Sequence, residues 1–518
     1  MSATLLSGLL AAACGGGDEG EATGSIDGAV KDGAQSQLAG SDGATTPDAP
    51  EPTSMEEWEA LWATERAAIV DGLTSGGFGR SADGTMLTGP EGFSVDLSAC
   101  GAGWSDTEGV TADLIKIGWP GPQSGPAADF GNAPRGAAAV LGAYAAEGAF
   151  ADASGGPRDV EVIIRDDGYD AARTVPLVDE MIDSDKVFGL TLMGSANAFK
   201  VYDKLNQRCI PNTFLVTGHP AWGDPVGHPW TSGGLLSYST EAILWGSYIE
   251  EHLDEWGGKA TVAALVTTND MGTAFDSSFR AYLAQSPRQA DIEYVTESVE
   301  QNTPNIKDPM TTLAAQQPNV YIAMVPGTPL CTQSIIESAE NGMREELDAA
   351  FLSSLCKAST YIGKDKVGGD GSVADGWQII GGGLKDFNAE ASADDPWIAW
   401  VRERLADAGH DYRTSANFGT GAALGWGMAQ SLLVAQELPG GLTRSNFILA
   451  VRSMDMTNPA LLPGVGFNMN GGADAYLVEG SDVSRWDAAG QRWATESTVE
   501  LSGASRPCAW DQATATCG

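Results

Sequence analysis

The sequence predicts an α/β protein of two lobes, each built on a mostly parallel sheet flanked by helices. The chain has 518 residues, of which 42% are hydrophobic, so at roughly 150 residues per domain it can form several large cores. From about residue 114, short apolar segments alternate with helical ones, as in βαβ units. An irregular stretch that ends near residue 238 divides this alternation into two series, one for each lobe.

The start of the chain indicates an exported lipoprotein. An apolar stretch ends at Cys14 and is followed by three glycines, which resembles a bacterial lipobox, where the cysteine is acylated. We therefore expect lipidation at Cys14 and interpret residues 1–14 as a signal remnant. No Lys or Arg precedes the apolar part, although secretory signals begin with positive charge, so we expect the true start to lie upstream. A cytosolic protein with an apolar start is the alternative.

Residues 15–53 are predicted to form a disordered acidic linker. The segment consists mainly of Gly, Ala, Ser, Asp, Glu and Thr and contains no aromatic residue. Such a composition buries too little apolar surface to offset the entropy of ordering. A flexible spacer of this kind would hold a folded body away from a membrane.

The charge balance excludes several classes of partner. Lys and Arg total 29 and Asp and Glu total 69, which gives a net charge of −40, and this repels nucleic acids and anionic lipid heads. No apolar run reaches the length of about twenty residues that a membrane span needs. With four His in the chain, we expect no metal site and no cofactor. His219, Asp224 and His228 lie in a Pro- and Gly-rich stretch that we interpret as a loop.

Six cysteines follow Cys14, and none forms a CxxC pair, which argues against zinc. An even number in an exported chain suggests three disulfides, although six cysteines allow fifteen pairings. We favour Cys508–Cys517 because its loop is short, then Cys331–Cys356 because both residues fall at strand ends, and Cys100–Cys209 by elimination. Free buried thiols are the alternative.

The elements follow in order along the chain. Residues 54–73 predict an amphipathic helix capped by Ser54, within an N-terminal extension at 54–113. The first series then predicts strands at 114–118, 160–164 and 187–192 and helices at 133–147, 170–182 and 196–206. The second predicts strands at 261–266, 292–295 and 320–325, helices at 240–255, 273–285, 308–316 and 332–342, and a later helix at 420–436.

Open parallel sheets bind ligands at the carboxyl ends of their strands. The loops to consider therefore follow residues 118, 192, 266 and 325, and all four are rich in small or polar residues. Each leads into a helix N-terminus, where free N–H groups and the helix dipole favour an anion.

Four segments resemble the type I periplasmic binding proteins of branched-chain amino-acid ABC importers. They are "IKIGWPGPQSGPAADFGNAPRGAA" (115–138), "VEVIIRDDGYDAARTVPLVDEMI" (160–182), "GLTLMGSANAFKVYDKLNQRCIP" (189–211) and "GWGMAQSLLVAQELPG" (425–440). The resemblance covers about 114–480, in order. The segments outside it look like an elaboration of actinobacterial lipoprotein relatives.

This resemblance implies two lobes joined by three crossovers at the base of a cleft, which hinge motion would close on a ligand. The crossovers are expected after 218–234, at 367–371 and at Pro463-Gly464. On this mapping the first lobe is 114–235 with 372–460, the second lobe is 236–371 with 461–495, and a disulfide-bearing tail occupies 496–518.

The resemblance also implies a binding site. The Ser195 hydroxyl and the backbone N–H groups of Ala196 and Asn197 would hold a ligand carboxylate, with a helix cap as the alternative role for Ser195. Trp119 and Phe130 would supply apolar walls, unless they are ordinary core residues. The full set of candidates is Trp119, Gln123, Ser124, Phe130, Gly194, Ser195, Ala196, Asn197, Asp270, Met271, Gly272 and Thr328.

Two positions depart from the family pattern. Met271 stands where relatives often have an aromatic residue, which makes that wall more adaptable. Residues 326–330 contain no carboxylate, although amino-acid binders place one there, and an unpaired buried ammonium is costly. Either Asp270 substitutes or the ligand lacks an ammonium group. We favour the second interpretation, which indicates a carboxylic acid, an amide or another small polar metabolite.

These observations predict a monomeric, non-catalytic solute receptor of an ABC importer. It would sit on the outer face of the cell membrane, held there only by its N-terminal lipid, and present a small amino acid, carboxylic acid or amide to permease subunits. A sensory ligand-binding lipoprotein is one alternative. A secreted hydrolase is a weaker one, suggested by 15 Trp and many carboxylates, because no GxSxG nucleophile elbow is present.

Overall fold

The first lobe is built on a parallel sheet of five strands in the order β5-β4-β6-β7-β8. The protein is known from a computed structural model, which describes residues 26–40, 51–152, 154–514 and 516–517. The strands are β4 (Leu114–Gly121), β5 (Asp159–Asp166), β6 (Gly189–Leu190), β7 (Asn212–Leu215) and β8 (Thr231–Gly233). The helices are α3 (Asn132–Ala146), α4 (Ala171–Glu180), α5 (Ser195–Phe199), α6 (Tyr202–Gln207), α13 (Pro396–Asp407), α14 (Asn417–Glu437) and α15 (Arg444–Arg452).

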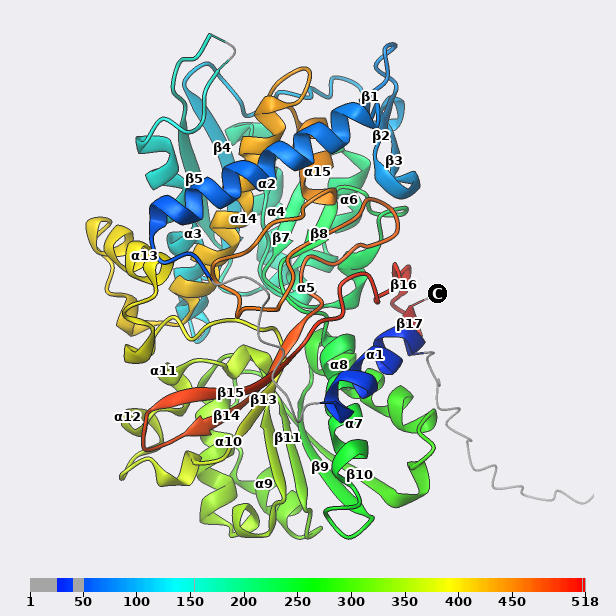
Figure 1. Cartoon of the computed structure of the whole chain (residues 1–518), viewed down its shortest axis with the longest axis vertical. Helices are drawn as coiled ribbons and strands as arrows, with labels where there is room; N and C mark the ends of the chain where they lie inside the picture. Colours follow the sequence, from blue (N-terminus) through cyan, green and yellow to red (C-terminus); the bar gives the residue numbers. More distant parts are fainter. Residues whose placement is uncertain (1–25, 41–50, 153, 515, 518) are drawn as a thin grey trace, which may run out of the picture.

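The second lobe is built on a seven-stranded sheet in the order β10-β9-β11-β12-β13-β14-β15. The first five strands are parallel, and β14 and β15 each pair antiparallel with the strand before them. Figure 1 shows the two lobes one above the other, with helices flanking each sheet. The strands are β9 (Ala260–Thr267), β10 (Ile292–Val299), β11 (Val320–Met324), β12 (Ala349–Leu352), β13 (Gln378–Ile380), β14 (Ser481–Asp487) and β15 (Arg492–Val499). The helices are α7 (Tyr238–His252), α8 (Asp270–Ala284), α9 (Lys307–Ala314), α10 (Pro329–Glu340), α11 (Ser359–Ile362) and α12 (Lys364–Val367).

This arrangement confirms the predicted fold class, and the predicted long elements lie close to their expected places. Helices α13 and α15 and strands β12 to β15 were not predicted. The shorter elements differ. The stretch before residue 238 contains β7 and β8, which the sequence did not predict because their polar Asn and Thr residues hide the apolar pattern of a buried strand. The single helix expected at 196–206 is two, because Val201 between α5 and α6 has a non-helical backbone (φ −131°, ψ −14°).

Helices α3 and α14 pack so closely that glycine is needed between them. A Cβ atom on Gly421 of α14 would lie 1.8 Å from the backbone oxygen of Ala133, and one on Gly136 of α3 would lie 2.2 Å from the oxygen of Phe418. Gly142, also on α3, has no atom within 4 Å of its Cβ position. The glycines therefore set the distance between these two helices.

The N-terminal extension packs on the first lobe. Helix α2 (Met55–Ser75) begins after Ser54, whose side chain accepts from the N–H of Glu57, and its Trp62 ring lies 5.2 Å from the ring of Trp426 on α14. A small antiparallel sheet follows, formed by β1 (Gly79–Arg80), β2 (Met86–Thr88) and β3 (Ser94–Asp96). At the other end of the chain, β16 (Trp510–Asp511) and β17 (Thr516–Cys517) form a hairpin.

The expected disorder of residues 15–53 is wrong for part of that segment. Helix α1 (Gly28–Ala39) lies within it and buries Val30, Ala34 and Leu38, which recur every four residues and so share one face. Gln35 of α1 donates to the Glu250 carboxylate of α7 at 2.6 Å. The polar composition of residues 15–53 as a whole conceals this short apolar face in the sequence. The predictions for Cys14, for the signal remnant and for linker residues 15–25 and 41–50 lie outside the described residues.

Two predicted lobe boundaries also need correction. Strand β13 pairs with β12 and β14 in the second sheet, so the assignment of 372–460 to the first lobe is wrong at its start. The second crossover follows β13, at Gly381–Gly383, and not at 367–371. Strand β15 extends to Val499, so the second lobe includes the first residues assigned to the tail.

The structure forms the three expected disulfides. Cys100–Cys209 ties the N-terminal extension to the first lobe, Cys331–Cys356 lies within the second lobe, and Cys508–Cys517 closes the C-terminal hairpin. In the part of the chain that the structure describes, no helix is long and apolar enough to cross a membrane.

Candidate ligand-binding site

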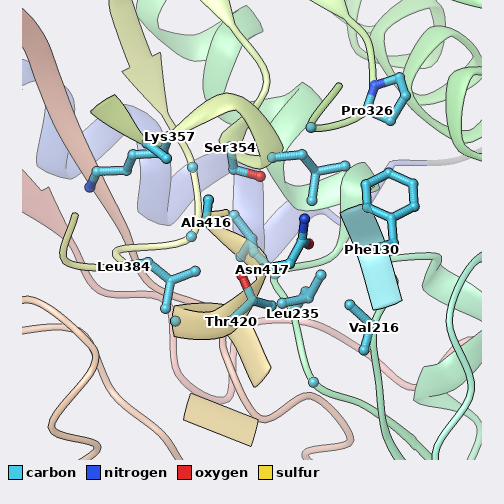
Figure 2. Close-up of a pocket in the computed structure, with 18 of the residues that line it drawn as sticks. Phe130, Val216, Leu235, Pro326, Ser354, Lys357, Leu384, Ala416, Asn417 and Thr420 are labelled. Carbon is cyan, nitrogen blue, oxygen red and sulfur yellow. The ribbon is translucent and has the colours of Figure 1, made fainter. Parts of the chain in front are cut away.

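A cavity of about 170 Å³ lies between the lobes, and its walls come from both of them and from the crossovers. Six of the twelve predicted site residues line it: Phe130, Gly194, Ser195, Ala196, Asp270 and Met271. Figure 2 shows Phe130 and Val216 at one end of this cavity and Leu384 and Lys357 at the other. The loops after the first and third strands of lobe one and after the first strand of lobe two therefore meet, as the parallel sheets predict.

Ser195 is the polar centre of the lobe-one wall. It is the first residue of α5, not its cap, and its Oγ lies 2.7 Å from Oγ1 of Thr217. Both side chains are buried. The Tyr238 hydroxyl, which also lines the cavity, bonds to Thr217 as well. Because three hydroxyls share two hydrogen bonds, one hydrogen remains available to donate to a ligand oxygen.

Gly194 brings the backbone of this wall close to an aromatic ring. Its φ of +84° is in the region that favours glycine, and a Cβ there would lie 2.5 Å from the Tyr169 hydroxyl oxygen. The Tyr169 ring in turn lies 5.5 Å from that of Phe130, so the two form one aromatic wall. Sequence reasoning missed Tyr169, although it follows the carboxyl end of β5, where a ligand-binding loop is expected.

The other predicted residues of the first lobe do not line the cavity. Trp119 has no exposed surface, because both faces of its parallel strand are covered. Asn197 donates to the buried carboxylate of Asp167 at 3.3 Å. Gln123 N–H and Ser124 Oγ donate to the two oxygens of Asp166, at 2.8 and 2.6 Å.

These two bonds hold the loop after β4 against the loop after β5. With the Ser124 hydroxyl as the largest cause, they lower the pKa of Asp166 to about 2. Asp166 is therefore ionised at neutral pH and keeps both bonds. Gln123 and Ser124 stabilise the frame of the site and do not line the cavity.

In the second lobe, two predicted residues act as structural groups. Gly272 donates its N–H to Oδ1 of Asn269, the residue that caps α8, at 3.0 Å. Thr328 caps α10, where its Oγ1 accepts from the N–H of Leu330 at 3.3 Å. Neither lines the cavity.

Asp270 is the acidic side chain of the cavity wall. It is half-buried at the first position of α8, and burial raises the pKa of its carboxyl group, against a lowering by the charge of Lys200. Among the described residues its carboxylate has neither a hydrogen bond nor an ion pair. It is therefore an unpaired acceptor on the lobe-two side of the cavity.

The two lysines that line the cavity already have partners. Lys357 is 4% exposed, and its Nζ lies 2.5 Å from Oδ2 of the fully buried Asp482; Figure 2 shows its ammonium turned away from the cavity. Lys385 pairs with Glu51 at 2.9 Å and with Asp395 at 2.8 Å. Neither lysine is a free counter-charge for an anionic ligand.

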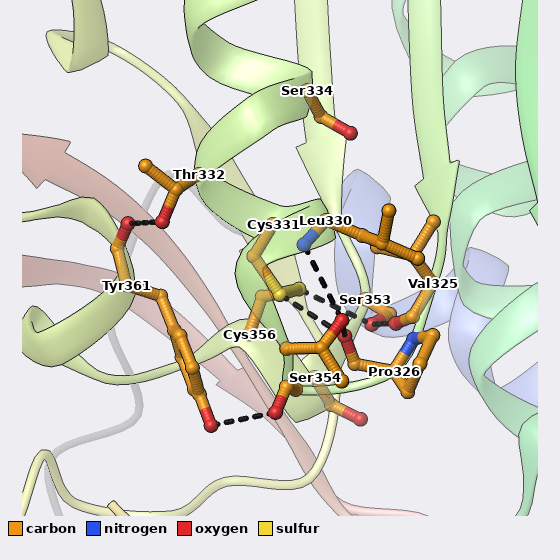
Figure 3. Close-up of a disulfide and its surroundings, with 12 residues drawn as sticks. Val325, Pro326, Leu330, Cys331, Thr332, Ser334, Ser353, Ser354, Cys356 and Tyr361 are labelled. Atoms are coloured by element: carbon orange, nitrogen blue, oxygen red, sulfur yellow. Dashed lines mark hydrogen bonds between the residues drawn. A yellow bond between two sulfur atoms is a disulfide. The ribbon is translucent and has the colours of Figure 1, made fainter. Parts of the chain in front are cut away.

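A disulfide fastens together the two lobe-two loops that line the cavity (Figure 3). Pro326 and Gly327 belong to the loop after β11, whereas Ser354 to Tyr361 follow β12. The bond between Cys331 and Cys356 joins the segments directly. The Tyr361 hydroxyl also donates to the Gly327 carbonyl at 2.7 Å.

Much of the remaining wall is apolar, although Asn388, Asn417 and Thr420 also line it, and the sequence did not predict it. It is formed by side chains on the crossovers and on the late return of the chain to the first lobe, which no strand-end argument identifies. Its apolar residues are Leu235, Leu384, Phe387, Trp397, Ile398, Leu461 and Val478.

The fold and the cavity agree with a comparison by sequence. The family model for periplasmic binding proteins matches residues 114–491. The chain therefore belongs to the periplasmic binding protein family, whose members bind ligands and are not enzymes. No curated protein sequence matches the chain.

Solved structures show the same fold. The chain is similar to a branched-chain amino acid ABC transporter protein of Thermus thermophilus with bound valine (17% identity, TM-score 0.62, 74% of this chain and 96% of that one). It is similar to a solute-binding protein of R. palustris in complex with 4-hydroxybenzoate (15%, 0.60, 75% and 97%). It is also similar to a fatty acid ABC transporter substrate-binding protein of Thermomonospora curvata (16%, 0.57, 78% and 95%).

Proposed function

We propose that this protein is the solute receptor of an ABC importer and that its ligand is a small amino acid with an apolar side chain. The observation that carries the proposal is that a polar group from each lobe lines the same cavity. The Ser195–Thr217 hydroxyl pair offers a hydrogen to a carboxylate, and Asp270 offers an unpaired carboxylate to an ammonium.

This choice revises the preference drawn from the sequence. The loop at 326–330 still offers no carboxylate, but Asp270 lines the cavity and lacks a partner. An anionic ligand without an ammonium group would face that carboxylate with only the exposed Lys200 nearby, because Lys357 and Lys385 are already paired. An ammonium at Asp270 removes this repulsion.

The size and walls of the cavity limit the rest of the ligand. A cavity of about 150 Å³ holds a benzene molecule, and this one has about 170 Å³. Phe130, Tyr169 and Met271 surround the polar end with apolar surface. Valine and 4-hydroxybenzoate, the ligands of two similar structures, are carboxylic acids of this size class.

Matched ligands test the proposal. We would titrate the purified protein with L-leucine and L-phenylalanine and with 4-methylpentanoate and 3-phenylpropanoate, which lack only the amino group. The expected result is one-to-one binding by calorimetry and a raised melting temperature with an amino acid but not with its deaminated partner. Tighter binding of the deaminated acids would contradict the amino-acid assignment. Failure of all four, and of wider panels of acids, amides and sugars, would contradict the receptor function.

We also propose an extracytoplasmic location, lipid attachment at Cys14 and delivery to permease subunits, with the protein acting as a monomer. Disulfides are typical of oxidising compartments, and three are formed here. Expression of the chain with a complete signal, followed by membrane fractionation, tests the anchor: a Cys14→Ala variant should leave the membrane fraction. Uptake that depends on neighbouring permease genes would separate import from sensing.

A further inference from the structure

A second cavity, of about 290 Å³, lies beside the connections between the lobes. Its walls include Pro220 and Ser237, on either side of the first crossover, and Tyr476 on the third. The start of α1 and the residues around the C-terminal hairpin cover it. It shares no lining residue with the cavity between the lobes, and α1 and the hairpin lie outside the segment that matches the family.

Two largely buried residues present hydroxyl groups without partners to this cavity. Ser237 and Thr240 are 4% and 3% exposed, and both line the cavity. Ser237 precedes α7 at the capping position, yet its side chain makes no capping hydrogen bond, although serine usually does so there. Within the described part of the chain, neither hydroxyl has a hydrogen-bond partner. Both hydroxyls are open to the cavity, so a molecule there can form hydrogen bonds to both of them.

The rest of the lining is neutral and rich in hydroxyls. Ser278 donates to Ser239 at 2.8 Å, which leaves the hydrogen of the Ser239 hydroxyl available. The charged residues Asp27 and Arg506 pair with each other, with Oδ1 and Nε 3.5 Å apart, and offer no net charge. Trp510 adds an aromatic surface.

We propose that this cavity is a second binding site, for a small uncharged polyhydroxyl compound such as a polyol or a monosaccharide. A ligand hydroxyl both donates and accepts, and so can satisfy Ser237 and Thr240, whose hydroxyls do the same. The apolar C–H face of a sugar ring suits an aromatic surface, whereas a charged ligand would find no counter-charge. A site of this kind has few polar groups, each placed to fix orientation.

The experiment uses the full chain and three probes: glycerol, myo-inositol and D-glucose. Binding is measured by calorimetry and by saturation-transfer NMR on the wild type and on Thr240→Val, Ser237→Ala and Thr273→Val. The Val substitutions keep the shape of threonine and remove its hydroxyl. Thr273 is exposed on the neighbouring helix α8 and lines neither cavity, so it is the matched control. Circular dichroism and melting temperature confirm that each variant folds.

At least one probe should bind the wild type. Its affinity should fall roughly fivefold in Thr240→Val or Ser237→Ala, the effect of one net hydrogen bond, and stay unchanged in Thr273→Val. A Ser195→Trp variant, which fills the cavity between the lobes, should bind the same probe normally. The proposal is overturned if no probe binds, if both site variants bind as well as the wild type, or if Ser195→Trp abolishes binding.

Discussion

Ser354 donates two hydrogen bonds to Glu241, from its backbone N–H to Oε1 at 2.6 Å and from its hydroxyl to Oε2 at 2.7 Å. Ser354 lines the ligand cavity, and Gly381, at the second crossover, approaches the Glu241 carboxyl so closely that a Cβ there would lie 2.8 Å from it. The fully buried Glu241 therefore stabilises the loop after β12 and the second crossover where they line the cavity.

Burial raises the pKa of Glu241 to about 8 from its ordinary value of 4.5, despite the two bonds from Ser354. The folded protein thus holds a proton that the unfolded chain releases between these two pH values. The stabilisation is fully present below pH 4.5 and is lost as pH rises toward 8. We expect the wild type to lose stability over this range and Glu241→Gln, which cannot ionise, to lose less. Urea unfolding at pH 5 and pH 8 measures both slopes, and parallel slopes would refute the assignment.

Removal of the Ser195 hydroxyl should weaken ligand binding without unfolding the protein. Ser195→Ala leaves Thr217 with the Tyr238 hydroxyl as its partner, so the hydrogen available to a ligand carboxylate is displaced. A hydrogen bond to a charged group contributes about 1.5–3 kcal/mol, so calorimetry should show an affinity at least tenfold lower, with the melting temperature of the unliganded protein little changed. Ser431→Ala, whose hydroxyl donates to the Gly427 carbonyl away from the cavity, is the control.

Asp270 should decide between ligands with and without an ammonium group. Asp270→Asn keeps the shape of the side chain and removes its charge. We expect it to weaken binding of an amino acid by about tenfold or more and to leave unchanged, or to strengthen, binding of the deaminated analogue. Equal effects on the two ligands, measured as a ratio of dissociation constants, would show that Asp270 does not contact the ammonium.

The disulfide between Cys331 and Cys356 should matter for binding as well as for stability. By the chain-entropy relation, removal of this 25-residue link costs about 3.5 kcal/mol, and removal of the 9-residue link Cys508–Cys517 costs about 2.6 kcal/mol. Double serine variants of each pair should both melt earlier. Only Cys331→Ser/Cys356→Ser should release ligand faster, because only this pair fastens loops of the ligand cavity. Equal dissociation rates by stopped flow would contradict this role.

Close packing of α3 and α14 gives a test of the first lobe. Gly421→Ala would place a methyl group 1.8 Å from the Ala133 oxygen, so the helices must separate. Overpacking of this kind costs about 1–3 kcal/mol. Gly142→Ala meets no atom within 4 Å and should stabilise by up to about 1 kcal/mol, through helix propensity alone. Denaturant unfolding of the two variants would show opposite signs.

The sequence predicted those helices and strands whose apolar residues recur with a regular period. The alternation from residue 114 predicted most long elements up to α10, but not α13, β14 or β15. The ends of parallel strands indicated the loops that hold Ser195, Asp270 and Met271, and the family resemblance implied their roles. The four loops considered did not include the one after β5, so Tyr169 was missed. Trp119 illustrates the limit of residue type as evidence, because an aromatic residue at the end of a buried strand packs into the core as readily as into a site.

The apolar wall of the cavity could not have been predicted in this way. Leu384, Trp397 and Leu461 reach it only through the path of the crossovers and the late return of the chain, which depend on tertiary packing. Helix α1 was missed for a related reason, because Val30, Ala34 and Leu38 are few, and only their partners on the second lobe make them a core.

The order of the strands in the second sheet determines when that sheet can be completed during synthesis of the chain. All five strands of the first sheet precede residue 234, whereas the second sheet is closed by β14 and β15, near the end of the chain. While the last segment is still emerging from a ribosome or a translocase, β13 has an open edge available to any other extended polypeptide. A chain cut short before residue 481 would keep that edge permanently, so we expect it to associate with other copies of itself and to require a chaperone.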